Sequence, residues 1–225
     1  MTFDLYPGEI LGITGLLGSG RTELALALFG MDKPDRGEIL MSGKPVRFKS
    51  VGDAIEHGIA YVPENRLTQG LAMKQTVRRN IVSSTIRRLV TTFGLIDQEK
   101  LDRESERWVK ELDIKIPSIE SPVETLSGGN QQRVVLAKWL ATDPKILILD
   151  GPTVGIDVAA KAAIHRTIRD LAAQGIGIVI ISDEVAEVHG SCNRVLVMHR
   201  GRLLHQFDPG ETSAEEIQTA IETAS

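Results

Sequence analysis

The most constraining stretch of this sequence is a glycine-rich loop between an apolar segment and a helix-forming one. Ile10 to Ile13 is strand-like, Gly15 to Gly20 is the loop, and Glu23 to Phe29 is rich in leucine and alanine. Glycines let consecutive backbone N–H groups turn inward, and the following helix presents its positive end to an anion. The stretch therefore predicts a phosphate cradle. The alternative is an ordinary glycine-rich turn between a strand and a helix.

The spacing of this loop is that of G-x-x-x-x-G-K-[ST], the phosphate loop of nucleotide triphosphatases, with one departure. Arg21 stands where the lysine belongs. A guanidinium still attracts phosphate, but it is planar and forked, so we expect phosphate binding to survive better than the placement of a γ-phosphate. The residues predicted to bind the nucleotide are Gly15, Leu16, Leu17, Gly18, Ser19, Gly20, Arg21, Thr22 and Glu23.

Composition and charge narrow the class of protein. The chain has 225 residues, of which 42% are hydrophobic, so it can bury one full core with or without a small appended subdomain. The net charge of −4 does not suggest nucleic-acid binding. The apolar runs Ile146 to Leu149 and Ile176 to Ile181 are far shorter than the roughly 18 residues that span a bilayer. We therefore expect no direct membrane insertion, and any link to a membrane to go through a partner.

The single cysteine, Cys192, excludes an internal disulfide and is typical of a reducing compartment. Together with His189, His199 and His205 it matches no zinc-binding spacing, so we expect structural or solvent-exposed roles for these four residues.

Beyond the loop, strand-like and helical segments alternate. Glu38 to Phe48 predicts a short antiparallel hairpin, and Gly58 to Pro63 predicts a buried strand that ends in a polar loop. Ligands bind at strand ends in α/β sheets, so Glu64 is either a group near the phosphates or a solvated loop acid. From Thr76 to about Leu112, apolar residues recur at three- and four-residue spacing and predict an all-helical insertion.

Two more segments carry chemistry. Ser127, Gly128 and Gly129 stand ahead of a helix predicted over Val134 to Ala141, which offers a second anion site at a positive helix end. Pro144 to Asp150 is an apolar strand that ends in an aspartate. Asp150 and Thr22 would supply two oxygen ligands suited to a Mg²⁺ ion that bridges the β- and γ-phosphates.

The rest of the chain continues the alternation. The pattern predicts a helix over Ala159 to Gln174, a buried strand over Ile176 to Ile181, a hairpin of Arg194 to His199 with Leu203 to Phe207, and a helix over Ser213 to Thr223. The predicted fold is α/β: a P-loop NTPase core with a mostly parallel sheet and flanking helices, a small antiparallel β flap and an inserted α-helical subdomain. We predict that residues 1–70 form the first part of the core with the flap, residues 71–145 a helical subdomain, and residues 146–225 the second part of the core.

With these pieces in order, the sequence resembles an ABC-type ATPase over essentially its whole length. The residues that carry the resemblance are Leu126, Ser127, Gly128, Gly129 and Asn130 with the two glutamines after them for the signature, Ile146 to Asp150 for the Walker B strand, Gly155 to Asp157 for the D-loop, and Ser182 and Asp183 for the switch position. More narrowly, Gly20 to Glu23, Val62 to Arg66 and Ser127 to Gln132 are similar to the second, C-terminal nucleotide-binding domain of the ribose/galactose/xylose-type sugar importers.

The resemblance implies the cofactors ATP and Mg²⁺ and two kinds of partner. One is the first nucleotide-binding domain of the same polypeptide, or a second copy, which closes head to tail on this domain. The other is a membrane permease that meets the helical subdomain, with Glu64 at the Q-loop position. The expected location is the cytoplasmic face of the bacterial inner membrane, as a peripheral protein. The abrupt start at Phe3 to Gly8 looks like a domain cut from a longer chain, with Phe3 or Tyr6 as substitutes for the lost adenine-stacking ring.

In that family the hydrolytic site uses a loop lysine, a glutamate after the Walker B aspartate and a switch histidine. Here those positions hold Arg21, Gly151 and Asp183. Gly151 has no side chain to act as a base, and a positioned base is worth roughly 10²–10⁴ in rate. We predict that this domain's own site binds ATP without splitting it, while the signature completes the partner's site. Three alternatives remain: Gly151 is an engineered or incidental change in an active site, the chain is a purely regulatory nucleotide-binding module, or it is a soluble non-transport ABC-type ATPase.

Overall fold

The structure is a computed structural model that describes residues 1–91 and 94–223. It forms two compact units. The sheet unit comprises Met1–Tyr61, Lys145–Gly151 and Arg169–Ser225, and the helical unit comprises Val62–Pro144 and Pro152–Ile168. The predicted division at residues 70 and 145 stays a prediction.

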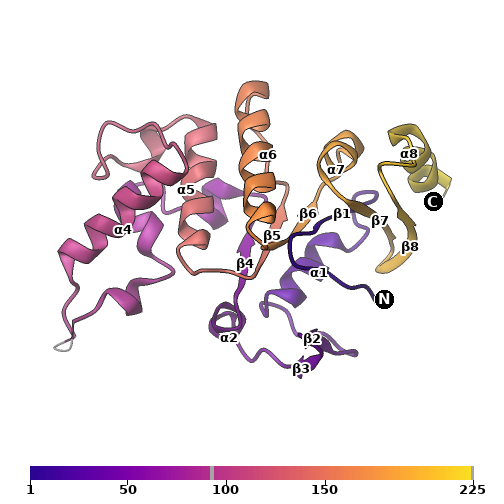
Figure 1. Cartoon of the computed structure of the whole chain (residues 1–225), viewed down its shortest axis with the longest axis horizontal. Coiled ribbons are helices and arrows are strands. Elements are labelled where there is room, and N and C mark those ends of the chain that lie inside the picture. Colours follow the sequence, from indigo (N-terminus) through magenta and orange to yellow (C-terminus); the bar gives the residue numbers. More distant parts are fainter. Residues whose placement is uncertain (92–93, 224–225) are drawn as a thin grey trace. The chain divides into compact units, whose positions relative to one another are not determined.

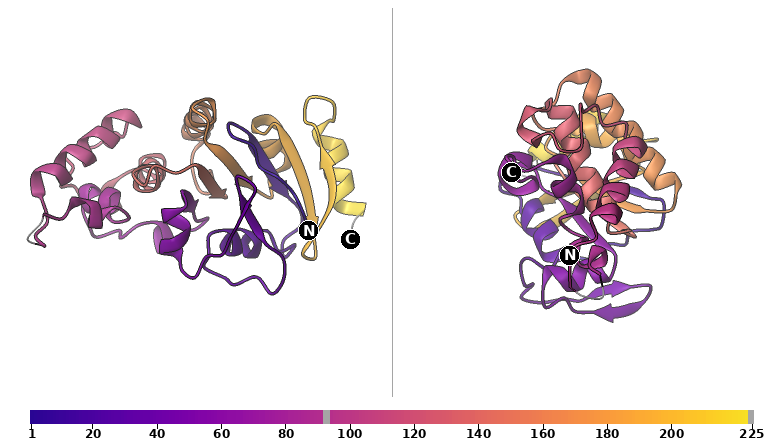
Figure 2. Two further views of the ribbon diagram at one scale, coloured as in Figure 1. Left: turned by 60° about the horizontal axis from the view of Figure 1, so that its bottom comes forward. Right: turned by 90° about the vertical axis from the view of Figure 1, so that its left-hand side faces the viewer.

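A six-stranded sheet with the strand order β4-β5-β6-β1-β7-β8 forms the centre of the sheet unit. Its strands are β1 (Ile10–Thr14), β4 (Ile59–Val62), β5 (Ile146–Asp150), β6 (Gly177–Ile181), β7 (Arg194–His199) and β8 (Arg202–Phe207). β1 pairs in parallel with β6 and β7, and β5 pairs in parallel with β6, whereas β7 and β8 form an antiparallel hairpin beside β1 (Figure 2). Parallel strands are covered on both faces, which is why these segments are continuous apolar runs. The predicted mostly parallel sheet is confirmed.

Helices cover both faces of this sheet. α7 (Val185–Ser191) packs on β1 and on α8 (Ala214–Thr223), while α1 (Arg21–Leu28) lies on the other side of the strands (Figure 1). Connections that cross over between parallel strands are right-handed. The chain moves along the sheet in one direction from β1 to β4 and in the opposite direction from β6 to β7, so the helices that follow β1 and β6 lie on opposite faces. Between the helices lies a core of fully buried side chains, among them Leu11, Ile13, Leu147, Leu149, Ile178 and Ile180.

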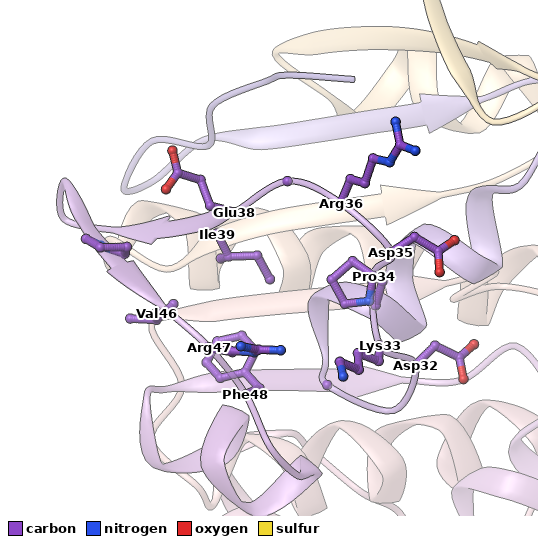
Figure 3. Close-up of a pocket in the computed structure, with 14 residues that line it drawn as sticks. Asp32, Lys33, Pro34, Asp35, Arg36, Glu38, Ile39, Val46, Arg47 and Phe48 are labelled. Atoms are coloured by element: carbon purple, nitrogen blue, oxygen red, sulfur yellow. The ribbon is translucent and has the colours of Figure 1, made fainter.

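The predicted flap is a two-stranded antiparallel sheet of β2 (Ile39–Met41) and β3 (Lys44–Val46), followed by α2 (Val51–Glu56). A cavity of about 400 Å³ lies among this hairpin, the loop over residues 32–38 and the C-terminal part of α1. Figure 3 shows the charged ends of Arg36 and Glu38 pointing away from one another and from Ile39. These two charged groups therefore do not converge on one point.

The helical unit confirms the predicted helical insertion but divides it. Its helices are α3 (Val77–Val82), a 3₁₀ turn at Ile86–Leu89, α4 (Gln98–Glu111), a 3₁₀ turn at Val123–Thr125 and α5 (Gly128–Leu140), with a π-helix, η1 (Arg66–Gly70), ahead of them. Val90 and Ile96, between the second of these helical segments and α4, form an isolated antiparallel bridge, so the insertion also contains residues outside helices. α6 (Val158–Ala173) begins in this unit and continues into the sheet unit.

The signature helix begins earlier than predicted. α5 starts at Gly128 with Ser127 at its N-cap, whereas the predicted helix starts at Val134. The two glycines have low helix propensity, and tertiary packing of the first turn overrides it. Ser127 and the glycines therefore form the end of the helix itself. Among the described residues no helix is long and apolar enough to cross a membrane.

Candidate functional site

The predicted phosphate loop lies between β1 and α1. Gly18 and Gly20 adopt left-handed conformations, with φ of 76° and 96°. Gly20 is the N-cap of α1, and no side chain caps this helix end. The N–H groups of the first helical turn therefore keep their capacity to bind an anion at the positive end of the helix dipole. Leu17, at the tip of the loop, is 95% exposed, so the loop is open to solvent.

The β7–β8 hairpin holds this loop from behind. The N–H of Gly201, at the tip of the hairpin, donates to the carbonyl of Ser19 at 2.8 Å. Gly15 lies so close to β7 that a Cβ atom there would be 2.1 Å from the carbonyl oxygen of Met198. The loop conformation is thus set by a hairpin almost two hundred positions away along the chain, a contact that no local sequence pattern indicates.

Arg21, the residue in the lysine position, is joined to the end of β6. Its Nη1 donates to the carbonyl oxygen of Ser182 at 2.7 Å. The next residue, Asp183, is exposed. The first residue of α1 is therefore tied to the predicted switch segment, and the guanidinium has a protein acceptor as well as any phosphate to bind.

Asp150 ends β5 and is only 4% exposed. Its Oδ2 accepts a hydrogen bond from the hydroxyl of Tyr61 at 3.1 Å, and the Tyr61 ring packs against Phe29 with ring centroids 5.5 Å apart. A buried carboxylate needs such donors, because its desolvation is costly. Tyr61 is a residue of the candidate site that sequence reasoning missed, since it lies in β4 and its contact depends on the neighbouring strand.

Replacing Tyr61 with phenylalanine is expected to lower the free energy of unfolding by about 1–2 kcal/mol. The ring contact with Phe29 would remain, but the Asp150 carboxylate would lose a donor while staying buried. Urea denaturation of the variant and the parent chain measures this difference. An unchanged denaturation midpoint would contradict a stabilising role for the hydroxyl.

Gly151 forms the turn after β5. Its φ is 54°, and its N–H donates to the carbonyl of Ile181 at 2.8 Å. The structure thus places the loop over Gly15 to Glu23, Asp150, Gly151 and Asp183 at the carboxyl ends of neighbouring strands of one sheet. This edge is where ligands bind in α/β sheets. Thr22 is in the first turn of α1 and exposed.

The predicted signature residues form the N-terminus of α5 in the helical unit. The Oγ of Ser127 accepts a hydrogen bond from the Nδ2 of Asn130 at 3.0 Å, and the Oδ1 of Asn130 accepts one from the N–H of Lys115 at 2.8 Å. The buried Gln131 donates through Nε2 to the carbonyl of Leu126 at 3.1 Å. Because the amide donates to the Ser127 oxygen, the hydroxyl hydrogen of Ser127 is not used in this contact and can be donated to another acceptor.

The other predicted residues of the helical unit are Glu64 and Asp157. Glu64 is exposed just after β4. Asp157 is exposed and accepts a hydrogen bond from the N–H of Ala160 at 2.9 Å, near the start of α6. The residues before it, Val154 and Gly155, are bound by Arg66, a contact that the sequence did not predict.

The four residues considered as a metal set lie in ordinary surroundings. The Nε2 of His189 is 2.9 Å from the carbonyl oxygen of Thr212. Burial, helped by the nearby Glu187, raises the pKa of the Cys192 thiol well above its usual range, so the thiol stays protonated. In the part of the chain that the structure describes, no group of three or more His, Cys, Asp or Glu residues could hold a metal ion.

The family described as ABC transporter matches residues 1–154 of this sequence. The chain belongs to the ABC transporter family. Among curated members, it is 45% identical over 217 residues to the putative ribose/galactose/methyl galactoside import ATP-binding protein 1 of Agrobacterium fabrum, covering 96% of this chain and 43% of that protein. It is also 45% identical over 220 residues to the xylose import ATP-binding protein of Geobacillus kaustophilus, covering 97% of this chain and 44% of that protein.

Solved ABC structures share the fold. The chain is 25% identical to cbiO1 from Clostridium perfringens, part of an ABC transporter complex, with a TM-score of 0.80 over 99% of this chain and 86% of that one. A nucleotide-free ATP-binding cassette from an ABC transporter, at 23% identity, has a TM-score of 0.79 over 98% of this chain and 87% of that one. The predicted fold class and the resemblance to sugar-import ATP-binding proteins are confirmed. The chain spans less than half the length of these curated relatives, and its correspondence to their second domain stays a prediction.

Proposed function

We propose that this chain is a nucleotide-binding domain of a sugar-import ABC transporter and corresponds to the second domain of the tandem type. It binds ATP with Mg²⁺ at its own phosphate loop, and it donates its signature segment to ATP held by a partner domain. The names of its relatives, which refer to the import of ribose, galactose and xylose, support the sugar-import part of the proposal.

The observation that carries the proposal is an open anion cradle at a sheet edge that also holds an oxygen-ligand pair. The left-handed glycines and the uncapped helix end fit a triphosphate, because their N–H groups need an acceptor. The Thr22 hydroxyl and the Asp150 carboxylate are ligands of the type that Mg²⁺ prefers. A Mg²⁺ ion held by them would neutralise charge on the β- and γ-phosphates.

Three positions support the proposal that this site does not split ATP. Gly151 has no side chain to orient or activate water. Arg21 hydrogen-bonds to the Ser182 carbonyl, so its guanidinium is shared between the protein and any bound phosphate. Asp183 occupies the switch position and would bring a negative charge beside the phosphates. Each of these changes lowers phosphoryl-transfer competence, and together they favour loss of hydrolysis over an otherwise active site.

The proposed partners follow from the family. The signature face of the helical unit would meet the first nucleotide-binding domain of the same polypeptide, or a second copy. The helical unit would also contact a membrane permease, with Glu64 in the Q-loop position. The protein would then work as a peripheral component at the cytoplasmic face of a bacterial inner membrane. Nucleotide-driven closure of two such domains would convert ATP binding into transport.

Titration of Mg-ATP against the chain, alone and with its partner domain, tests the proposal if binding and phosphate release are followed separately. We expect the chain alone to bind Mg-ATP and to release phosphate at least about a hundredfold more slowly than the assembled transporter, since a positioned base is worth roughly 10²–10⁴. Fast turnover by the chain alone would refute the loss of hydrolysis. Absence of turnover with a competent partner would favour the purely regulatory module.

A pair of aspartate variants controls this titration. Asp150→Asn replaces a carboxylate oxygen at the strand end with a weaker amide ligand. Added Mg²⁺ should therefore strengthen ATP binding less in this variant than in the parent chain. Asp170→Asn makes the same chemical change at an exposed position and should leave the Mg²⁺ dependence as in the parent chain. Equal behaviour of the two variants would contradict the assignment of Asp150 as a metal ligand.

A further inference from the structure

Arg66 has a set of contacts that the proposed function does not explain. Its Nη1 donates to the carbonyl of Val154 at 2.7 Å and its Nη2 to the carbonyl of Gly155 at 3.0 Å. Its Nε points to the Oε1 of Gln131 at 3.4 Å. The first two acceptors lie at the start of the D-loop, and the third lies on the signature helix α5. One guanidinium thus joins three segments of the helical unit.

The acceptors of Arg66 are all neutral. Among the described residues no aspartate or glutamate forms an ion pair with it, and partial burial lowers its pKa because the charged form is desolvated. The Arg66 guanidinium nevertheless remains protonated, because arginine does not lose its proton in proteins. A planar fork can hold two successive carbonyls at once, which a lysine ammonium cannot do with the same geometry. The site therefore requires arginine for its shape as well as its charge.

Gly128, the first residue of α5, is fitted to this guanidinium. A Cβ atom at position 128 would lie 2.8 Å from the Nη2 of Arg66 and 3.3 Å from the carbonyl oxygen of Gly155. The guanidinium occupies the space that a side chain would need, directly beside the N-cap Ser127. The absence of a side chain at this signature glycine thus lets the D-loop and the helix end approach each other through Arg66.

The segment that carries Arg66 is anchored at both ends. The Oδ1 of Asn65 accepts hydrogen bonds from the N–H groups of Leu67 and Thr68, both at 3.2 Å. At the other end, the carbonyl of Gly70 accepts one from the Nζ of Lys138 on α5 at 3.1 Å. The intervening residues form η1, a π-helix, and such turns are rare and often found at functional sites. Arg66 therefore projects from a fixed base.

We propose that Arg66 is a positioning residue that holds the D-loop and the first turn of the signature helix at a fixed spacing, so that both present one rigid face to the ATP of the partner domain. The inference rests on the proposed donation of the signature in trans. The inference adds to the proposed donation the side chain that keeps Ser127 and the D-loop at a fixed spacing. Arg66 acts through these neighbours and does not itself need to touch ATP.

Amide hydrogen exchange in the chain tests the contact without any need for ATP. In Arg66→Lys we expect the amides of Ala160 and Lys161, which donate to Asp157 of the D-loop, to exchange at least about tenfold faster than in the parent chain, because the loop that carries their acceptor loses one of two bonds to its carbonyls. Arg103→Lys is the matched control: Arg103 is exposed on α4 and pairs with Glu99 one turn away, so the same exchange rates should be unchanged. Parent-like exchange in Arg66→Lys would overturn the proposal.

ATP turnover in the assembled transporter tests the positioning role. We expect Arg66→Lys to lower kcat at least about tenfold while KM changes less than about twofold, because ATP is held by the partner's loop and only the presented face is misplaced. Gly128→Ala should give the same split, since its Cβ displaces the guanidinium from the other side. It provides a second variant if Arg66→Lys folds poorly.

The outcomes separate this inference from the proposed function. If Arg66→Lys shows faster exchange but an unchanged kcat, Arg66 contributes only to local packing and the positioning role is overturned. If the parent assembly shows no ATP turnover at all, the proposed function fails, whereas the exchange measurement still shows whether Arg66 holds the D-loop.

Discussion

Replacing Ser127 with glutamate is expected to reduce ATP turnover of the assembled transporter at least about a hundredfold. Ser127 is exposed at the N-cap of α5, and its oxygen accepts a hydrogen bond from Asn130, so its own hydroxyl hydrogen can be donated to another acceptor. In the proposed arrangement that acceptor is the partner's ATP. A carboxylate there would remove the donor and add a repulsion of order 4 kcal/mol at about 4 Å and an effective dielectric constant near 20.

The fold should tolerate this substitution. A negative charge at a helix N-terminus is favourable, so the free energy of unfolding of Ser127→Glu should change by less than about 1 kcal/mol. Ser118→Glu adds the same charge at another exposed position of the helical unit and should leave turnover at the parental level. Turnover is measured as phosphate release from Mg-ATP. Parental turnover in Ser127→Glu would reject donation of the signature in trans.

The sequence was a good guide to the sheet because its strands are buried on both faces. Ile146 to Leu149 and Gly177 to Ile181 are uninterrupted apolar runs, which is the pattern that parallel strands require. Turn residues separate them from amphipathic helices. The phosphate loop was equally clear, since a strand, closely spaced glycines and a helix in that order have few alternative conformations.

Local patterns failed where tertiary contacts decide the conformation. Glycine lowers helix propensity, so Gly128 and Gly129 argued against the first turn of α5, yet Ser127 and the buried Gln131 place them inside the helix. The spacing of apolar residues between Thr76 and Leu112 predicted helices but not where each one ends, and the structure has separate helical segments with a bridge between Val90 and Ile96.

The contacts that complete the candidate site join distant parts of the chain. Arg66 binds a carbonyl 88 positions away, and the Tyr61 hydroxyl binds a carboxylate 89 positions away. Both side chains project from elements whose hydrophobic pattern does not indicate which residues they contact. Sequence motifs can name the residues that face a ligand, whereas the residues that hold them in place become visible only with the fold.

Gly15→Ala is expected to lower the free energy of unfolding by about 4 kcal/mol, the largest stability effect in the phosphate loop. Its Cβ would lie 2.1 Å from the carbonyl oxygen and 3.1 Å from the carbonyl carbon of Met198, and φ is 153°. Met198 belongs to β7, which pairs with β1, so neither backbone can move away without breaking the sheet. Overpacking typically costs about 1–3 kcal/mol and a strained backbone about 1–3 kcal/mol more.

Gly18→Ala separates these two contributions, because both glycines lie in the same loop with positive φ. Gly18 has a φ of 76° and nothing within 4 Å of the added Cβ. Its substitution therefore introduces only the left-handed strain, about 1–2 kcal/mol. Urea denaturation of both variants gives the difference, which should appear as a lower midpoint at an unchanged m-value. Equal stabilities would show that the hairpin yields to a methyl group, and the close approach of β7 would then not fix the conformation at Gly15.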